Sequence, residues 1–184
     1  MKHILHLVQQ LATLRALTLQ QPYASLSVDG HKHHETRSWS VSYRGWLLIH
    51  AGKEEFKGWR ENQDLVDYMR MSYRGKLRGH ARSGLVGAVF LSDVRPAEQV
   101  KADRLTMPQE LAFGNFDDGR FGWKMEAPLA FPEPIDCGGH QGLWIPPAAL
   151  LTQLPYAVLV HLATNLTEPK PWAPALVDFY RSHL

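Results

Sequence analysis

The chain is poor in cysteine and has no long apolar segment. Cys137 is the only cysteine among 184 residues, so no disulfide can form within the chain, as is typical of a reducing compartment. No apolar run approaches the roughly 18 residues that a membrane-spanning helix requires. Residues 1–14 lack the apolar block and small-residue cleavage site of a secretory signal. We therefore expect a cytoplasmic protein with no membrane partner.

A strong excess of charge is also missing. Lysine and arginine number 20, aspartate and glutamate 18, and the net charge is +2, so overall charge alone does not indicate a nucleic-acid partner. With 45% hydrophobic and 21% charged residues, the composition is that of a globular domain. One basic stretch without acidic residues, 70–82, contains Arg74, Lys76 and Arg78. It fits either a solvated loop or a nucleic-acid contact.

Hydrophobic patterning predicts several short strands among irregular loops, at residues 15–19, 33–37, 45–51, 85–94, 121–125 and 142–145. Helices are expected at residues 1–14, 23–28, 54–69, 148–154 and 171–184. A proline-rich turn is expected between the last two strands, at Pro128, Pro132 and Pro134. This mixture predicts an α+β fold with a mixed, mainly antiparallel barrel rather than a doubly wound sheet.

Three polar segments carry the functional prediction. The first is QPYAS at 21–25, followed by GHKHHETRSW at 30–39. The second is RGWLLIHA at 44–51, and the third runs from GWKM at 122–125 to GLW at 142–144. Each segment is weakly specific alone, but together and in this order they are more specific.

This order of segments resembles the ASCH domain family. Within this family, the sequence is most similar to the variant found at the C-terminus of a thyroid-receptor-interacting transcription coactivator and in free-standing bacterial and phage proteins. The resemblance covers residues 15–147 and implies a PUA-like barrel whose cleft binds RNA or DNA. Residues 1–14 would then be an N-terminal helical extension, and 148–184 a C-terminal extension packed on the domain.

The extended segment 33–37 divides its polar side chains between two faces. Glu35 and Arg37 share one face, while His34 lies on the other. A glutamate beside an arginine can orient the guanidinium for a phosphate or a base edge, or it can simply close the barrel as an ion pair. Lys32 reaches the same cleft only if the turn at Gly30 directs it there.

Other candidates surround this pair. Arg44, Lys53 and Lys32 would form a basic cleft if they converge. Tyr23, Trp39 and Trp123 could either stack on bases or pack in the core. Trp46 and Trp144 are expected in the core. The full set of predicted nucleic-acid contacts is Gln21, Tyr23, Lys32, Glu35, Arg37, Trp39, Arg44, Lys53, Arg74, Lys76 and Arg78.

Two other functions stay open. One branch of the family hydrolyses acetylcytidine with a lysine, a threonine three residues later and a distant glutamate; here Lys32 matches, but Glu35 occupies the threonine position. A ribonuclease could use His50 or His34 beside Lys32 as an acid or base. The catalytic candidates are Lys32, Glu35 and His50. Alternatively, the domain binds an acidic protein. Neither a metal nor another cofactor is expected, since consecutive histidines in a strand point to opposite faces.

Overall fold

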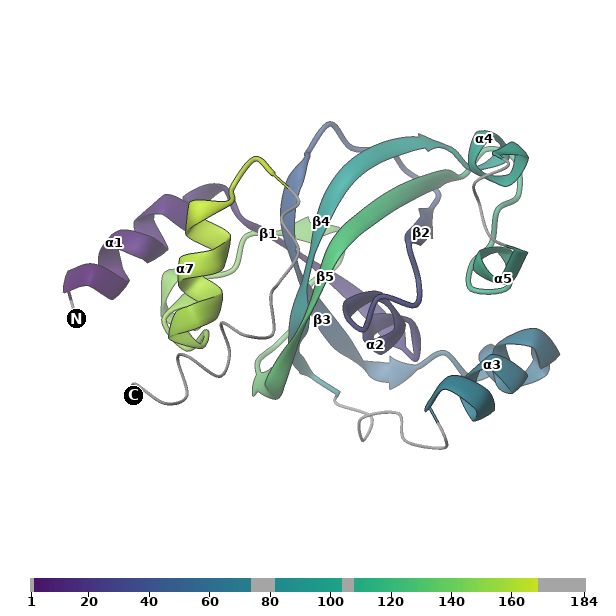
Figure 1. The fold of residues 1–184 in the computed structure, drawn as a ribbon, viewed down its shortest axis with the longest axis horizontal. Helices are drawn as coiled ribbons and strands as arrows, with labels where there is room; N and C mark the ends of the chain where they lie inside the picture. The colour runs from purple at the N-terminus through teal and green to yellow at the C-terminus, as the bar shows by residue number, and fades with distance from the viewer. Residues whose placement is uncertain (1, 74–81, 104–107, 169–184) are drawn as a thin grey trace.

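The fold is a curled sheet with helices around it (Figure 1). The computed structural model describes residues 2–73, 82–103 and 108–168. Its strands are β1 Arg15–Gln21, β2 His34–Arg37, β3 Gly45–Glu55, β4 Gly84–Pro96, β5 Phe121–Asp136 and β6 Leu143–Trp144. Its helices are α1 Lys2–Gln10, α2 Tyr23–Val28, α3 Gln63–Tyr73, α4 Ala97–Ala102, α5 Pro108–Leu111, α6 Ala148–Leu151 and α7 Tyr156–Thr164, with 3₁₀ turns η1 Leu11–Thr13 and η2 Lys57–Glu61.

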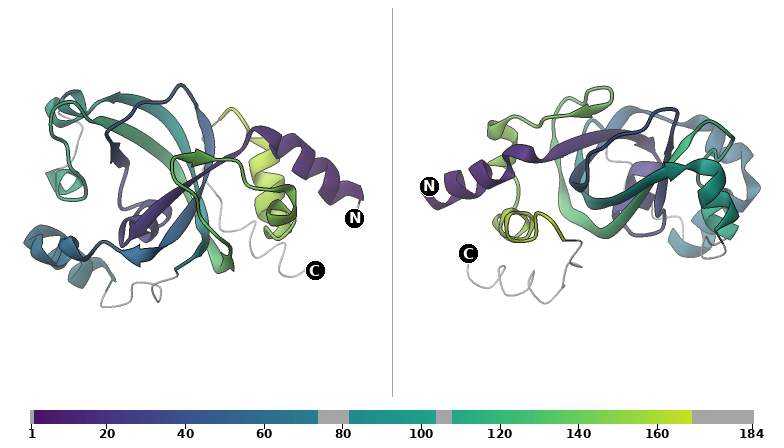
Figure 2. Two further views of the ribbon diagram at one scale, coloured as in Figure 1. Left: turned by 180° about the vertical axis from the view of Figure 1, so that it is seen from behind. Right: turned by 90° about the horizontal axis from the view of Figure 1, so that it is seen from above.

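The six strands form one sheet in the order β2-β5-β4-β3-β1-β6. The β1–β3 pair is parallel, and the other neighbouring pairs are antiparallel. The sheet curls into a half-barrel with flanking helices, and this confirms the predicted α+β, PUA-like, mainly antiparallel architecture (Figures 1 and 2). Within the described residues, no helix is long and apolar enough to cross a membrane.

Strand β3 is apolar on both faces because it separates two cores. Trp46 and Leu48 contribute to a core shared with α1, α6 and α7, whereas Leu47 and Ile49 contribute to the core that α2 completes. Since successive side chains of a strand point to opposite faces, the continuous run GWLLIHA serves both cores at once. The predicted core positions of Trp46 and Trp144 are confirmed.

The two ends of the described chain meet on one side of the sheet. Helices α1 and α7 lie side by side there in all views (Figures 1 and 2). Leu7 and Val8 of α1 and Leu159 of α7 are buried in the same core cluster. The predicted helix 171–184 and the basic residues Arg74, Lys76 and Arg78 lie outside the described residues.

The predicted proline-rich turn is wrong, because β5 continues through all three prolines. β2 pairs only with the first part of β5, at Phe121–Lys124, so the remainder of β5 has β4 as its partner on one side. Proline lacks an N–H donor and is tolerated where that position of a strand faces an open edge. The register shifts between β4 and β5 accommodate this irregular stretch.

The predicted helix 54–69 is interrupted. β3 continues to Glu55, and η2 is separated from α3 by Asn62. The Asn62 side chain accepts a hydrogen bond from Leu65 N at 3.0 Å, which is the contact an N-cap residue makes. Asn62 therefore begins a new helix, and the connection from β3 to α3 remains available to border a pocket.

Gly87 tests the close packing of α2 on the sheet. A Cβ at this position would lie 2.3 Å from Leu129 O and 2.7 Å from Val28 of α2. Gly87→Ala should lower the free energy of unfolding by about 1–3 kcal/mol or more in urea denaturation, because backbone and helix must move apart. Gly138→Ala, where nothing lies within 4 Å, is the control. Equal stability of the two variants would contradict this packing.

Candidate functional site

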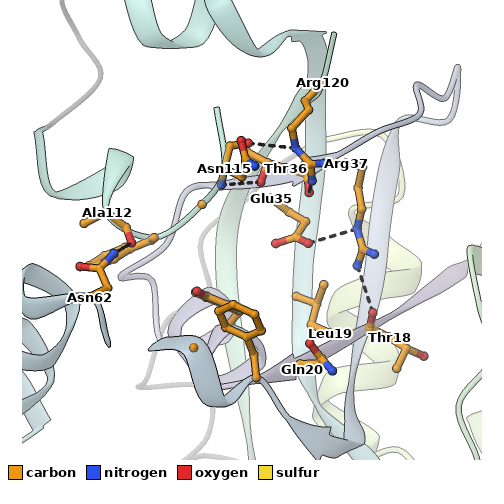
Figure 3. Close-up of a pocket in the computed structure, with 15 residues that line it drawn as sticks. Thr18, Leu19, Gln20, Glu35, Thr36, Arg37, Asn62, Ala112, Asn115 and Arg120 are labelled. Carbon is orange, nitrogen blue, oxygen red and sulfur yellow. Dashed lines mark hydrogen bonds and ion pairs between the residues drawn. The ribbon is translucent and has the colours of Figure 1, made fainter. Parts of the chain in front are cut away.

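A pocket of about 510 Å³ opens beside the exposed side of β2. Its walls come from the end of β1, α2, the β3–α3 connection and residues 112–115. Figure 3 shows its lining side chains, with Glu35 and Arg37 of β2 at the centre. A cavity of this volume is within the range of small-molecule sites. We call it the first pocket.

Glu35 and Arg37 form the predicted pair. The Arg37 Nε lies 3.1 Å from Glu35 Oε1, and Arg37 Nη2 donates to the Thr18 carbonyl at 3.1 Å (Figure 3). Both side chains are largely buried but reach the pocket. The guanidinium is therefore held in one orientation by two partners on β1 and β2, and its other N–H groups are available to a ligand.

Lys32 lies beneath the pocket rather than in its opening. The turn at Gly30, with φ of +79°, brings Lys32 to the side of Glu35, where Nζ and Oε2 are 3.7 Å apart. Its ammonium group donates to Phe113 O at 2.8 Å and to His34 O, and the residue is 2% exposed. Burial lowers the pKa of Lys32, while Glu35 acts in the opposite direction.

Three aromatic residues border the first pocket: Tyr23, Phe56 and the buried Phe113. Tyr23 lies over the Lys32 ammonium at 5.5 Å and contacts Phe56, with ring centroids 5.7 Å apart. Burial and the negative charge of Glu35 raise the pKa of Tyr23 to about 12, so its hydroxyl is neutral at physiological pH. Phe56 is 42% exposed. Phe56 falls within the predicted helix 54–69, and that prediction did not indicate its position at the pocket.

Glu110 is a second feature that sequence reasoning missed. It is 3% exposed, and its carboxylate accepts hydrogen bonds from the backbone N–H groups of His33 and His34. These bonds join α5 to the start of β2, and so they fix the segment that carries Lys32 and Glu35. The only signal in the sequence is a glutamate in a polar loop, which does not indicate a partner almost 80 residues away.

The opposite rim is formed by Arg120 and Asn115. Arg120 donates to Asn115 O and to Thr36 O, both at 3.1 Å, and Asn115 N donates to the Thr36 hydroxyl oxygen at 3.1 Å (Figure 3). These bonds tie the loop before β5 to β2. They also place a second guanidinium at the first pocket, which then contains two arginines and one glutamate.

A second pocket of about 700 Å³ adjoins the first. Both pockets are bordered by Thr18 and Arg37, and the second also contains Trp39, His50 and Lys53. His50 is buried, its Nε2 lies 3.1 Å from Cys137 O, and burial lowers its pKa. Its ring is therefore neutral near pH 7 and donates from Nε2.

The structure does not bring all of the predicted contacts together. Arg44 precedes β3 and pairs with Asp93 at 3.8 Å, whereas Lys53 lies near the other end of the same strand. Arg44 borders neither pocket, and so it does not converge with Lys53 and Lys32. Gln21 is 1% exposed and accepts a bond from Ser25 N.

The catalytic candidates are also separated. His50 borders the second pocket, whereas Glu35 borders the first and Lys32 lies beneath it. The Thr36 hydroxyl, which lies one position after the threonine expected of the hydrolase branch, accepts the Asn115 N–H. Of the remaining aromatics, Trp123 is fully buried, and Trp39 packs edge-on against it with centroids 4.6 Å apart.

Lys32→Met tests whether the ammonium group supports the fold. In the variant, the carbonyl oxygens of Phe113 and His34 lose their donor, and the Glu35 carboxylate loses one of its two cationic partners. The free energy of unfolding should therefore fall by about 2–4 kcal/mol in urea denaturation. The exposed Lys53→Met is the matched control and should change stability by less than about 0.5 kcal/mol. A small effect for both would contradict a supporting role for Lys32.

His34 predicts a pH dependence of stability. Burial, with repulsion by Lys32 and Arg95, lowers the pKa of His34 from 6.5 to about 4. Between about pH 4 and pH 6.5, unfolding therefore takes up a proton at His34. The contribution of the neutral His34 ring to the free energy of unfolding is complete above about pH 6.5 and is lost as the pH falls toward 4. Wild type should lose roughly 2 kcal/mol relative to His34→Gln across this interval in urea denaturation. A pH-independent difference would contradict the prediction.

Comparison with known proteins supports the family. Residues 17–125, more than half of the chain, match the model of the ASCH domain. The crystal structure of an ASCH protein from Zymomonas mobilis is 11% identical, covers 77% of this chain and 92% of its own, and has a TM-score of 0.47. A point mutant of that protein is 12% identical, with coverage of 76% and 94% and a TM-score of 0.45. No curated protein is significantly similar in sequence. By its match over residues 17–125, the chain belongs to the ASCH domain family.

Proposed function

We propose that the protein binds single-stranded nucleic acid, RNA or DNA, and that the first pocket takes one unpaired nucleotide. The observation that carries the proposal is the presence of an oriented guanidinium and an exposed aromatic ring in one pocket. Arg37 is held by Glu35 and Thr18, and Phe56 borders the same space. A fixed donor fork reads a phosphate or a base edge, and a ring offers a stacking surface to any base.

The size and charge of the first pocket support this ligand. Its volume of about 510 Å³ suits a single nucleotide better than a paired helix. Among the charged residues that border the pocket, Arg37 and Arg120 outnumber Glu35, while the buried Lys32 and Glu110 nearby carry opposite charges. A phosphate would be attracted here, while the Glu35 carboxylate can accept a hydrogen bond from the amino group of a base.

Hydrolysis of acetylcytidine and cleavage of RNA remain alternatives from the same family. Lys32 contacts two carbonyl oxygens and Glu35, and His50 belongs to the other pocket, so the candidates Lys32, Glu35 and His50 do not come together in one site. Product analysis after incubation with acetylcytidine and with labelled RNA tests both activities. We expect no turnover, and turnover abolished by Glu35→Gln would favour the hydrolase.

Phe56→Ala tests stacking. Binding of fluorescently labelled single-stranded RNA and DNA, measured by anisotropy, should weaken by about 5- to 100-fold, because stacking contributes about 1–3 kcal/mol per base. Leu5→Ala removes another exposed apolar side chain, on α1, that borders neither pocket, and this variant should bind as wild type does. Unchanged binding by Phe56→Ala would contradict the proposed location.

Arg37→Lys tests the guanidinium fork. Lysine keeps the charge but cannot bond to two ligand atoms in the same plane, so affinity should fall about tenfold while the slope of log affinity against log salt stays nearly the same. Arg44→Lys, outside both pockets, is the matched control. For wild type, a slope of log affinity against log salt near zero would contradict any phosphate contact. The alternative of an acidic protein partner would then be favoured only if binding of such a protein were itself measured.

A further inference from the structure

The two pockets meet along a shared boundary. Thr18 and Arg37 border both, and the bond from Arg37 Nη2 to Thr18 O forms the wall between them. A ligand that contacts Arg37 from the first pocket is thus already at the edge of the second. The two pockets also differ in charge, since Glu35 borders the first, whereas the described residues that border the second include no carboxylate.

The second pocket has its own aromatic surface and its own cation. Trp39 is half-buried, with its edge contact to Trp123 fixing the ring, and it borders the pocket. Lys53 is exposed at the same pocket. The combination repeats that of the first pocket: a fixed ring that can stack on a base, next to positive charge that can meet a phosphate.

A glycine-rich loop, residues 137–142, also borders the second pocket and packs closely on His50. A Cβ at Gly139 would lie 2.4 Å from the His50 ring and 2.8 Å from Thr18 Oγ1, so only glycine allows this contact. Thr18 Oγ1 donates to His140 O at 2.9 Å, and His50 Nε2 donates to Cys137 O. Gly138, in contrast, borders open space. The loop is therefore fastened at three points, with bare backbone facing the pocket.

From these contacts we infer that the ligand is an oligonucleotide that occupies both pockets. This inference rests on the proposed function. One nucleotide lies in the first pocket, the strand crosses Arg37, and the following phosphate and base lie against Lys53 and Trp39. The glycine loop borders the strand on the other side, where its backbone can approach the strand closely at Gly138, which has no side chain and borders open space.

The inference predicts that affinity depends on ligand length. Unlabelled uridine and adenosine 5′-monophosphates and the corresponding trinucleotides compete with a labelled single-stranded RNA for the full-length protein. The trinucleotides should bind wild type at least about tenfold more tightly than the monophosphates, because the second pocket adds contacts within one molecule. Equal affinities of monomer and trimer would overturn the inference.

Two variants assign this gain to the second pocket. Lys53→Gln and Gly139→Ala should each reduce the trinucleotide advantage to less than about threefold and leave monophosphate binding unchanged. Lys101→Gln, which changes an exposed lysine on α4 outside both pockets, is the matched control and should keep the advantage. If Gly139→Ala does not fold, the trinucleotide advantage of Lys53→Gln alone tests the role of the second pocket, because Lys53 is exposed and its substitution should not affect folding.

The results separate this inference from the proposed function. If Phe56→Ala weakens all ligands while Lys53→Gln keeps the trinucleotide advantage, the first pocket binds nucleotides and the two-pocket inference is overturned. If neither monophosphates nor trinucleotides compete at any concentration used, the proposed function fails and the inference fails with it. The inference is supported if Lys53→Gln loses the tighter binding of the trinucleotides while Lys101→Gln keeps it.

Discussion

The buried ammonium group of Lys32 is the constraint on which the site depends. A cation that is 2% exposed must be paired, and its three partners come from two parts of the chain: His34 O and the Glu35 carboxylate of β2, and Phe113 O after α5. Satisfying it draws the 108–116 segment onto β2. It also fixes Glu35, which in turn orients Arg37 toward the Thr18 carbonyl. A single buried charge thus organises the floor of the first pocket.

This order of dependence separates residues that support the site from those that can contact a ligand. Lys32 and Glu110 hold backbone segments in place and are buried. Arg37, Phe56, Trp39 and Lys53 border open space and present a guanidinium, two aromatic surfaces and an ammonium group. Such a division is typical of a binding site whose donors are oriented before the ligand arrives, which reduces the entropy lost on binding.

The sequence predicted the fold class and the central pair because both follow from local pattern. The apolar run at 45–51 and the alternation of Glu35 and Arg37 in a strand require only the period of two. Positions set by distant contacts were not predictable. Glu110 binds β2 across almost 80 residues, and Phe56 reaches the pocket because Asn62 ends one turn and begins α3. The prolines of β5 led to the wrong prediction of a turn, because proline usually ends a strand. At the open edge of a sheet, however, a strand can contain proline.

A crystal structure of the protein with a bound single-stranded trinucleotide tests most directly whether the two pockets bind nucleic acid. One base should lie against Phe56 with Arg37 donating to the ligand, and the strand should continue toward Lys53 and Trp39. A trinucleotide bound on another surface, such as that around Arg44 and Asp93, would contradict this binding mode.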